Sequence, residues 1–145
     1  AALAVAGRNA ARHAVADRLA LREGPWFEAL AEDADGRFDL IVANPPYIAA
    51  RDLPSLAPEV RAHEPRLALT DEGDGFGAYR AIAADAAAHL RPGGRAIVEV
   101  GAGQAAEVAR LFEVAGLSGI ATRSDMDGRP RVVMARARLS RVPGA

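Results

Sequence analysis

The sequence has no cysteine, no lysine, few aromatic residues and no long apolar run. Without cysteine, the 145-residue chain can form neither disulfides nor a cysteine-ligated zinc site, and no thiol can serve as its nucleophile. No stretch approaches the roughly 18 apolar residues that cross a bilayer. No signal peptide is visible, although the chain does not begin with methionine. We therefore expect a cytoplasmic protein without a membrane partner.

Net charge is also nearly absent, at −1, which argues against a broad surface for nucleic acid or membrane. The length suits about one domain. Half of the residues are apolar and few are aromatic, so we expect a core built mainly from leucine, isoleucine, valine and alanine.

The chain alternates between helix-like and strand-like patterns. Helices are predicted at residues 1–16, 76–90 and 104–115, with one helical turn at 26–31. Strands are predicted at 18–22, 38–43, 95–100, 117–123 and 131–137, the last two paired antiparallel. Turns are expected at 33–36 and 91–94, a long loop at 44–75 and a frayed tail at 140–145. This alternation indicates a three-layer α/β sandwich with a mostly parallel sheet, whose clearest strand, 38–43, should be covered on both faces.

The tetrad Asn44, Pro45, Pro46 and Tyr47 directly follows the apolar segment 38–43. In open α/β sheets, ligands bind at the carboxyl ends of the strands, where these residues are predicted to lie. An amide, two prolines of fixed φ and an aromatic ring form a stiff polar wall, suited to holding a planar amide or amine nitrogen. From the four residues alone, a strand-ending turn remains the alternative.

The segment 39–48, Asp-Leu-Ile-Val-Ala-Asn-Pro-Pro-Tyr-Ile, resembles motif IV of S-adenosylmethionine-dependent methyltransferases that modify planar nitrogens. Segments 59–69, 74–80 and 99–104 follow it in the order and spacing of the HemK/PrmC family, the glutamine methyltransferases of peptide chain release factors. The resemblance runs from residue 1 to about residue 137. It implies a Rossmann-like class I methyltransferase fold with an antiparallel last strand, and an enzyme that methylates the glutamine of a Gly-Gly-Gln motif.

The resemblance also implies S-adenosylmethionine as methyl donor. In the family, a glycine-rich loop after the first strand holds the methionine part of the cofactor, and an acidic residue ending the second strand holds the ribose. No segment of this sequence matches either feature. We therefore expect residues 1–139 to be the carboxyl-terminal portion of the catalytic domain, without its first two strands and with unpaired sheet edges, and residues 140–145 to be a tail.

The tetrad has a definite role in the implied reaction. The Asn44 side-chain oxygen and the Pro45 carbonyl would accept the two N–H groups of the substrate amide, orienting its nitrogen and stabilising the positive charge that develops there. Pro46 helps to preset the backbone, and the Tyr47 ring would pack against the flat amide. Asn44 is also expected to contact the cofactor. No general base is required, because the methylated amide is acidic enough to lose its proton to water.

Four further residues are expected to support the site. Trp26 stands where the family has an aromatic residue beside the adenine of the cofactor, although Pro25 replaces the usual aspartate. The alternative is that Trp26 is a core residue. Arg61, Glu64 and Pro65 would brace the long loop over the substrate, the alternative being a solvated charged loop.

The remaining polar and glycine residues are given structural roles. Glu99 would cap a strand without chemistry, and Gly101 and Gly103 would form a tight turn, because the third glycine of a dinucleotide fingerprint is missing. The three histidines, His13, His63 and His89, lack the spacing of a metal site and are expected to lie on the surface.

Two other functions stay open at this point. An adenine or guanine amino-methyltransferase would need a basic groove for phosphates, whereas residues 48–75 carry six acidic residues against three arginines. The third possibility, of a different class, is a truncated substrate-binding fragment without activity of its own.

Overall fold

The computed structural model describes residues 2–30 and 37–139. The chain divides into two compact units, Ala1–Gly36 and Arg37–Ala145. The turn predicted at 33–36 and the tail predicted at 140–145 lie outside the described residues.

The first unit is helical. It contains α1 (Ala2–Arg12) and the 3-10 helices η1 (Ala16–Arg18) and η2 (Trp26–Leu30). The alanine-rich sequence of α1 favours a helix, and Arg12 in its last turn complements the helix dipole. The strand predicted at 18–22 is wrong, because residues 19–23 form no regular element. A strand must pair its backbone groups with a neighbour, and residues 2–30 contain no second strand.

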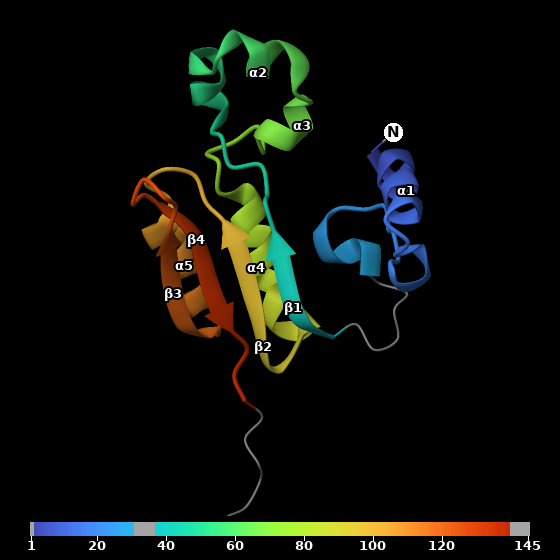
Figure 1. Ribbon diagram of the computed structural model, residues 1–145. Coiled ribbons are helices and arrows are strands. Elements are labelled where there is room, and N and C mark those ends of the chain that lie inside the picture. The colour runs from blue at the N-terminus through green and yellow to red at the C-terminus, as the bar shows by residue number, and fades with distance from the viewer. Residues whose placement is uncertain (1, 31–36, 140–145) are drawn as a thin grey trace, which may run out of the picture. The chain divides into compact units, whose positions relative to one another are not determined.

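The second unit is built on a four-stranded sheet in the order β1-β2-β4-β3. The strands are β1 (Phe38–Ala43), β2 (Leu90–Glu99), β3 (Ser118–Ser124) and β4 (Pro130–Arg136). β1 and β2 are parallel, and β4 is antiparallel to both of its neighbours, β2 and β3. Three strands therefore point one way and the last strand of the chain points the other, as Figure 1 shows. This arrangement is the one predicted for the fold class.

β2 begins five residues earlier than predicted. The turn expected at 91–94 lies inside the strand, where the pairing with β1 shifts register between Leu90 and Arg95. Gly93 takes a φ of +78° there, a value that a residue with a Cβ adopts only with strain. The glycines thus interrupt the ladder without ending the strand.

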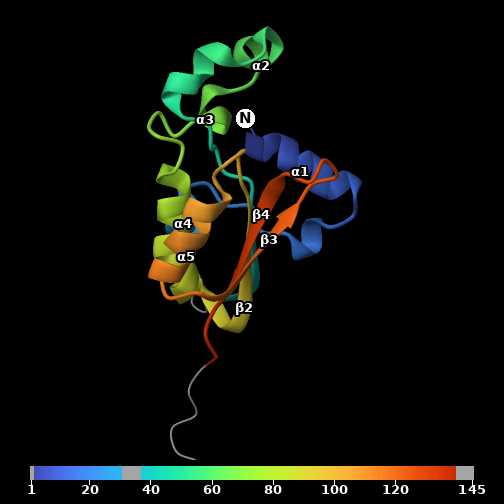
Figure 2. The ribbon, with the colours of Figure 1, turned by 90° about the vertical axis from the view of Figure 1, so that its left-hand side faces the viewer.

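Helices α4 (Gly77–His89) and α5 (Ala105–Val114) cover one face of this sheet (Figure 2). They were predicted to within two residues at each end. The core between these helices and the sheet contains fully buried side chains from both layers, namely Tyr79, Val98, Val108, Phe112 and Val133. Burying each of the larger apolar side chains stabilises the unit by about 1.5–3 kcal/mol.

The other face of β1 is not covered within residues 37–139. Leu40 is 47% exposed and Val42 is 69% exposed, so the expectation that this strand is covered on both faces is wrong for this unit. β1 is also an edge strand, since β2 is its one neighbour among the described strands. The second unit by itself therefore has two layers.

The segment 44–75, predicted to be a loop, contains three short helices. They are η3 (Ala50–Ser55), α2 (Pro58–His63) and α3 (Arg66–Leu69). Pro58 is preorganised for the first turn of α2. Glu64 is extended because it precedes Pro65, and this ends α2. In Figure 1 α2 and α3 lie beyond the carboxyl end of β1.

Candidate functional site

The tetrad lies where it was predicted, at the carboxyl end of β1, just after Ala43. Asn44 is exposed, Pro45 is buried, and Pro46 and Tyr47 are half-buried. Within residues 2–30 and 37–139, neither the Asn44 side chain nor the Pro45 carbonyl is engaged in a hydrogen bond. Two acceptors on one rigid segment are therefore available to a ligand.

A cavity of about 120 Å³ adjoins the tetrad. Its lining combines the strand end with α3 and consists of Asn44, Pro45, Tyr47, Ile48, Ala68 and Leu69. The Ile48 N–H donates to the Leu69 carbonyl at 2.9 Å, and this bond joins the strand-end side of the cavity to the α3 side. The cavity can admit a side-chain amide. It is well below the roughly 300 Å³ of the smallest pockets that enclose drug-sized ligands, so these residues do not fit S-adenosylmethionine as a whole.

Tyr47 is held from the sheet side. Its hydroxyl donates to Glu99 Oε1 at 3.4 Å. Burial raises the pKa of the Tyr47 hydroxyl, and the negative charge of Glu99 raises it further. The hydroxyl therefore stays protonated and serves as the donor. Glu99, which ends β2, anchors the tetrad through this bond.

Gln104, which was not among the predicted site residues, connects three segments of the site. Its Oε1 accepts from the Gly101 N–H at 2.9 Å and lies 3.3 Å from the Tyr79 hydroxyl, whose proton has a nearer acceptor in the Glu99 carbonyl at 3.0 Å. Its Nε2 donates to the Tyr47 carbonyl at 3.0 Å and to the Gly75 carbonyl at 3.4 Å. The tight turn predicted at 101–103 is present and brings Gln104 to this position.

Asp71, also missed, holds the segment that returns from α3 to α4. Its Oδ1 accepts from the N–H groups of Gly73 at 2.9 Å and Gly75 at 3.1 Å, and its Oδ2 accepts from Gly77 at 2.6 Å. Burial acts to raise the pKa of Asp71, but the three backbone donors outweigh it and lower the pKa. The Ala50 N–H donates to the Gly73 carbonyl at 2.9 Å, which ties this turn to the start of η3.

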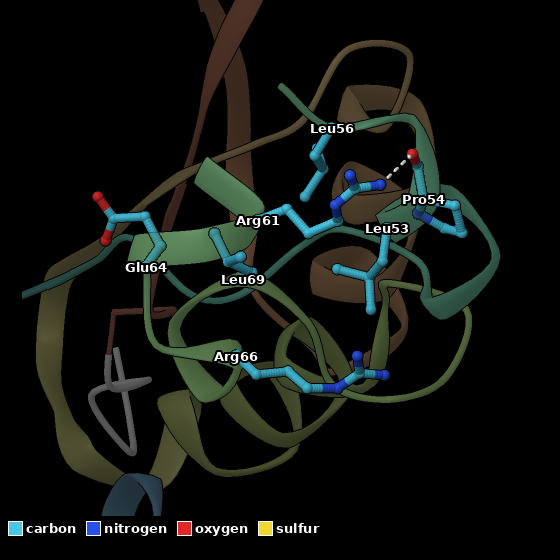
Figure 3. Close-up of a pocket in the computed structure, with 7 residues that line it drawn as sticks. All are labelled: Leu53, Pro54, Leu56, Arg61, Glu64, Arg66 and Leu69. Atoms are coloured by element: carbon cyan, nitrogen blue, oxygen red, sulfur yellow. Dashed lines mark hydrogen bonds between the residues drawn. The ribbon is translucent and has the colours of Figure 1, made fainter. Parts of the chain in front are cut away.

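A second cavity of about 270 Å³ lies among the short helices (Figure 3). It is lined by Leu53, Pro54, Leu56, Arg61, Glu64, Arg66 and Leu69. Arg61 donates to the Pro54 carbonyl at 3.1 Å, and this contact links α2 to η3. Glu64 points away from Arg61 in Figure 3, and Pro65 is the residue before α3. Leu69 lines both cavities. The bracing role of Arg61, Glu64 and Pro65 over a substrate stays a prediction.

Trp26 belongs to the first unit, where it begins η2. It is 43% exposed, so the alternative that it is a core residue is wrong. Its place beside the adenine of a cofactor stays a prediction.

The three histidines differ in exposure. His13 and His63 are exposed, and His89 is half-buried with Nδ1 3.0 Å from the Asp85 carbonyl. In the part of the chain that the structure describes, no three His, Cys, Asp or Glu side chains are grouped to hold a metal ion, and no helix has the length and apolarity to cross a membrane.

Comparison with known proteins identifies relatives of this chain. No family model matches the chain. A protein from Cereibacter sphaeroides named release factor glutamine methyltransferase is 57% identical over 136 residues, which are 94% of this chain and 48% of that protein. A protein of the same name from Xylella fastidiosa is 48% identical, again over 94% of this chain and 48% of the relative. The chain is a homologue of the release factor glutamine methyltransferases. The resemblance to the HemK/PrmC family is thereby confirmed, and the chain spans about half the length of the curated relatives it matches.

A solved structure supports the fold. An O-methyltransferase family protein from Burkholderia thailandensis matches 93% of this chain and 40% of its own, with a TM-score of 0.55 at 16% identity. At that identity the likeness concerns the fold alone, and it agrees with the predicted class I methyltransferase architecture.

Proposed function

We propose that this chain carries the acceptor site of an enzyme that methylates the side-chain amide of the glutamine in the Gly-Gly-Gln motif of peptide chain release factors. The methyl donor would be S-adenosylmethionine. The observation that carries the proposal is the small cavity beside two available acceptors, Asn44 Oδ1 and the Pro45 carbonyl. A primary amide offers two N–H donors, so its nitrogen can satisfy both acceptors.

The proposed chemistry of the acceptor side follows from these contacts. An amide nitrogen is a poor nucleophile, because its lone pair is delocalised into the carbonyl. Acceptors placed on both N–H groups orient the nitrogen and stabilise positive charge as it develops there. Pro45 and Pro46 fix φ, so the acceptors do not have to be ordered when the substrate arrives. The described residues account for the acceptor side, and no step of methyl donation is derived from them.

Charge favours a protein over a nucleic acid as the substrate. Residues 48–75 carry six acidic residues and three arginines. One of these arginines, Arg66, is already paired with Glu72, with Nη2 2.7 Å from Oε2. Asp74 stays ionised, since the hydrogen bond from Arg80 lowers the pKa of Asp74 to about 2. Such a surface repels phosphates. The proposal thus implies release factors as partners, translation termination as the process and the cytoplasm as the location, without metal or nucleic acid.

A transfer assay tests the proposal. The chain is incubated with labelled S-adenosylmethionine and one of three acceptors, namely a release factor, the same factor with its motif glutamine replaced by glutamate, or a duplex oligonucleotide. The Cereibacter relative serves as the positive control. We expect label on the unmodified factor alone. Label on the oligonucleotide would show an amino-methyltransferase instead. No transfer by the folded chain beside a working control would mean that it has no activity by itself.

Acceptor binding is tested separately with Asn44→Ala. A peptide containing Gly-Gly-Gln is titrated into the parent and the variant, with a Gly-Gly-Glu peptide for comparison. We expect Asn44→Ala to lose binding and transfer at unchanged thermal stability, because the side chain is exposed and makes no described contact. Asn9→Ala, which changes the chain's other asparagine, is the matched control. Undiminished binding or turnover in Asn44→Ala would remove Asn44 from the site.

A further inference from the structure

The side chain of Gln104 is hydrogen-bonded at both ends inside the site. Its oxygen accepts from the Gly101 N–H and its nitrogen donates to the Tyr47 and Gly75 carbonyls, three partners in three segments of the second unit. Gln104 is the residue before α5, yet its side chain makes no capping bond to that helix. The amide therefore hydrogen-bonds to the tetrad and to the turns around it, and it does not cap its own helix.

Two glycines make room for this amide. A Cβ on Gly101 would lie 2.6 Å from Gln104 Oε1. A Cβ on Gly75 would lie 3.2 Å from Gln104 Nε2 and 2.5 Å from the Tyr47 carbonyl oxygen. Gly75 also has a φ of +82°. Both positions exclude a side chain, so the close approach of the amide to the backbone depends on them.

The partners also fix which way the amide faces. On the Nε2 side lie two carbonyl oxygens, of Tyr47 and Gly75, which need a donor. On the Oε1 side lies the Gly101 N–H, which needs an acceptor. A flipped amide or an ionised carboxylate would set oxygen against oxygen. The site thus requires a neutral side chain that is donor at one end and acceptor at the other.

We propose that Gln104 is a positioning residue that acts through the Tyr47 carbonyl to fix the direction in which Asn44 and Pro45 present their acceptors. Tyr47 is then held at both ends, by Gln104 at its carbonyl and by Glu99 at its hydroxyl. The two prolines between Asn44 and Tyr47 transmit this orientation along the backbone, because φ is fixed at both. The consequence for catalysis rests on the proposed function, whereas the orientation itself does not.

The first test follows the Asn44 side chain directly. The chain has two asparagines and one glutamine, so its side-chain NH₂ signals in a nitrogen–proton correlation spectrum belong to Asn9, Asn44 and Gln104. In Gln104→Glu at pH 8 we expect the Asn44 signal to move, while that of Asn9 stays in place. An Asn44 signal at its parent position in this folded variant would overturn the proposal.

Lower pH should reverse the change. The carboxyl of Gln104→Glu faces two carbonyl oxygens in the folded state, and this raises its pKa above the unfolded value. Its favourable contribution is therefore present below the unfolded pKa of about 4.3 and lost as pH rises through the raised folded pKa. At pH 8 we expect Gln104→Glu to melt about 5 °C or more below the parent. Near pH 5 this difference in melting temperature should be at least halved. The Asn44 signal should return toward its parent position. A constant gap with no return would contradict the requirement for a neutral donor.

The catalytic consequence is measured in the transfer assay at a temperature where the variants are fully folded. We expect Gln104→Glu at pH 8, and Gln104→Met at any pH, to lower kcat about tenfold or more with a smaller effect on the KM for S-adenosylmethionine. Gln104→Glu should regain activity relative to the parent as pH falls. Parent-like kcat in folded variants would overturn the catalytic part. If the parent itself transfers no methyl group, the chain has no activity by itself, and the Asn44 signal still decides the positioning role.

Discussion

Removing the Asp71 carboxylate should destabilise the second unit more than the loss of one polar side chain usually does. Asp71 accepts three backbone N–H groups, from Gly73, Gly75 and Gly77, at 2.9, 3.1 and 2.6 Å. In Asp71→Ala these donors lose their partner at the start of α4. A hydrogen bond to a charged group is worth about 1.5–3 kcal/mol, and solvent that reaches this half-buried site replaces part of each bond. We therefore expect a loss of about 2–3 kcal/mol, or roughly 10–20 °C in melting temperature.

A graded series separates the hydrogen bonds from the charge. Asp71→Asn keeps one oxygen for Gly73 and Gly75 but turns an NH₂ group toward the Gly77 N–H, so about half of the loss, ~1–1.5 kcal/mol, is expected. Glu113→Gln removes an exposed charge from α5 and serves as the control, with a change within about 0.5 kcal/mol. The assay is urea unfolding followed by far-ultraviolet circular dichroism.

The pH dependence gives the sign of the effect. The pKa of Asp71 is lowered in the folded state, so its contribution is fully present above the unfolded pKa of about 3.9 and is lost as pH falls through the lower folded value. The gap in unfolding free energy between the parent and Asp71→Ala should be constant from about pH 5 to 8 and shrink below about pH 4. The reasoning would be refuted by a gap that widens in acid, or by an Asp71→Ala variant as stable as Glu113→Gln.

Four further substitutions test other contacts, each by its denaturant midpoint. Gly75→Ala and Gly103→Ala share a left-handed φ, of +82° and +78°, but a Cβ at Gly75 meets the Tyr47 carbonyl oxygen at 2.5 Å and one at Gly103 meets nothing within 4 Å. Gly103→Ala should lower the free energy of unfolding by about 1 kcal/mol, and Gly75→Ala should lower it by at least about 2 kcal/mol more. Equal losses in the two variants would show that the Cβ at position 75 does not meet the Tyr47 carbonyl. Tyr79→Phe removes the hydroxyl that donates to the Glu99 carbonyl of β2 at 3.0 Å. This should cost about 1–2 kcal/mol, and an unchanged midpoint would show that the bond adds no stability. Phe112→Ala empties a fully buried position and should cost about 3–5 kcal/mol, and a loss below about 1 kcal/mol would place Phe112 outside the core.

The sheet and its two long helices could be predicted because local pattern and tertiary environment agree there. The apolar run that becomes β2 and the amphipathic repeat that becomes α5 each face the environment that their periodicity implies. The apolar run of β1 forms the predicted strand, although Leu40 and Val42 stay exposed. Residues 18–22 show the limit of this logic, because alternation makes a strand only where a partner exists. The helices at 50–69 are four to six residues long, too short for a periodic signal, and chain stiffness at Pro58 and Pro65 shapes them.

The tetrad could be found from sequence because its residues are adjacent. Gln104 and Asp71 could not be assigned in this way. Gln104 meets Tyr47 across 57 positions in the chain, and Asp71 acts through backbone N–H groups, which every residue except proline has. Their roles become visible once the ends of β1 and β2 are brought together. The edge position of β1 and the exposure of Leu40 and Val42 likewise follow from topology, since a run of apolar residues looks the same at the edge and in the middle of a sheet.

The two backbone bonds at the base of the short-helix segment, from Ile48 to Leu69 and from Ala50 to Gly73, have a consequence for how this surface can diverge. They close the segment on itself beside the tetrad, so its length and composition between residues 51 and 67 can change while its ends stay fixed. For a flexible insertion, doubling the length of a closed loop costs only about 0.6 kcal/mol. The part of the molecule that would face a protein substrate can therefore vary among related proteins, or be exchanged by design, without moving the acceptors at the strand end.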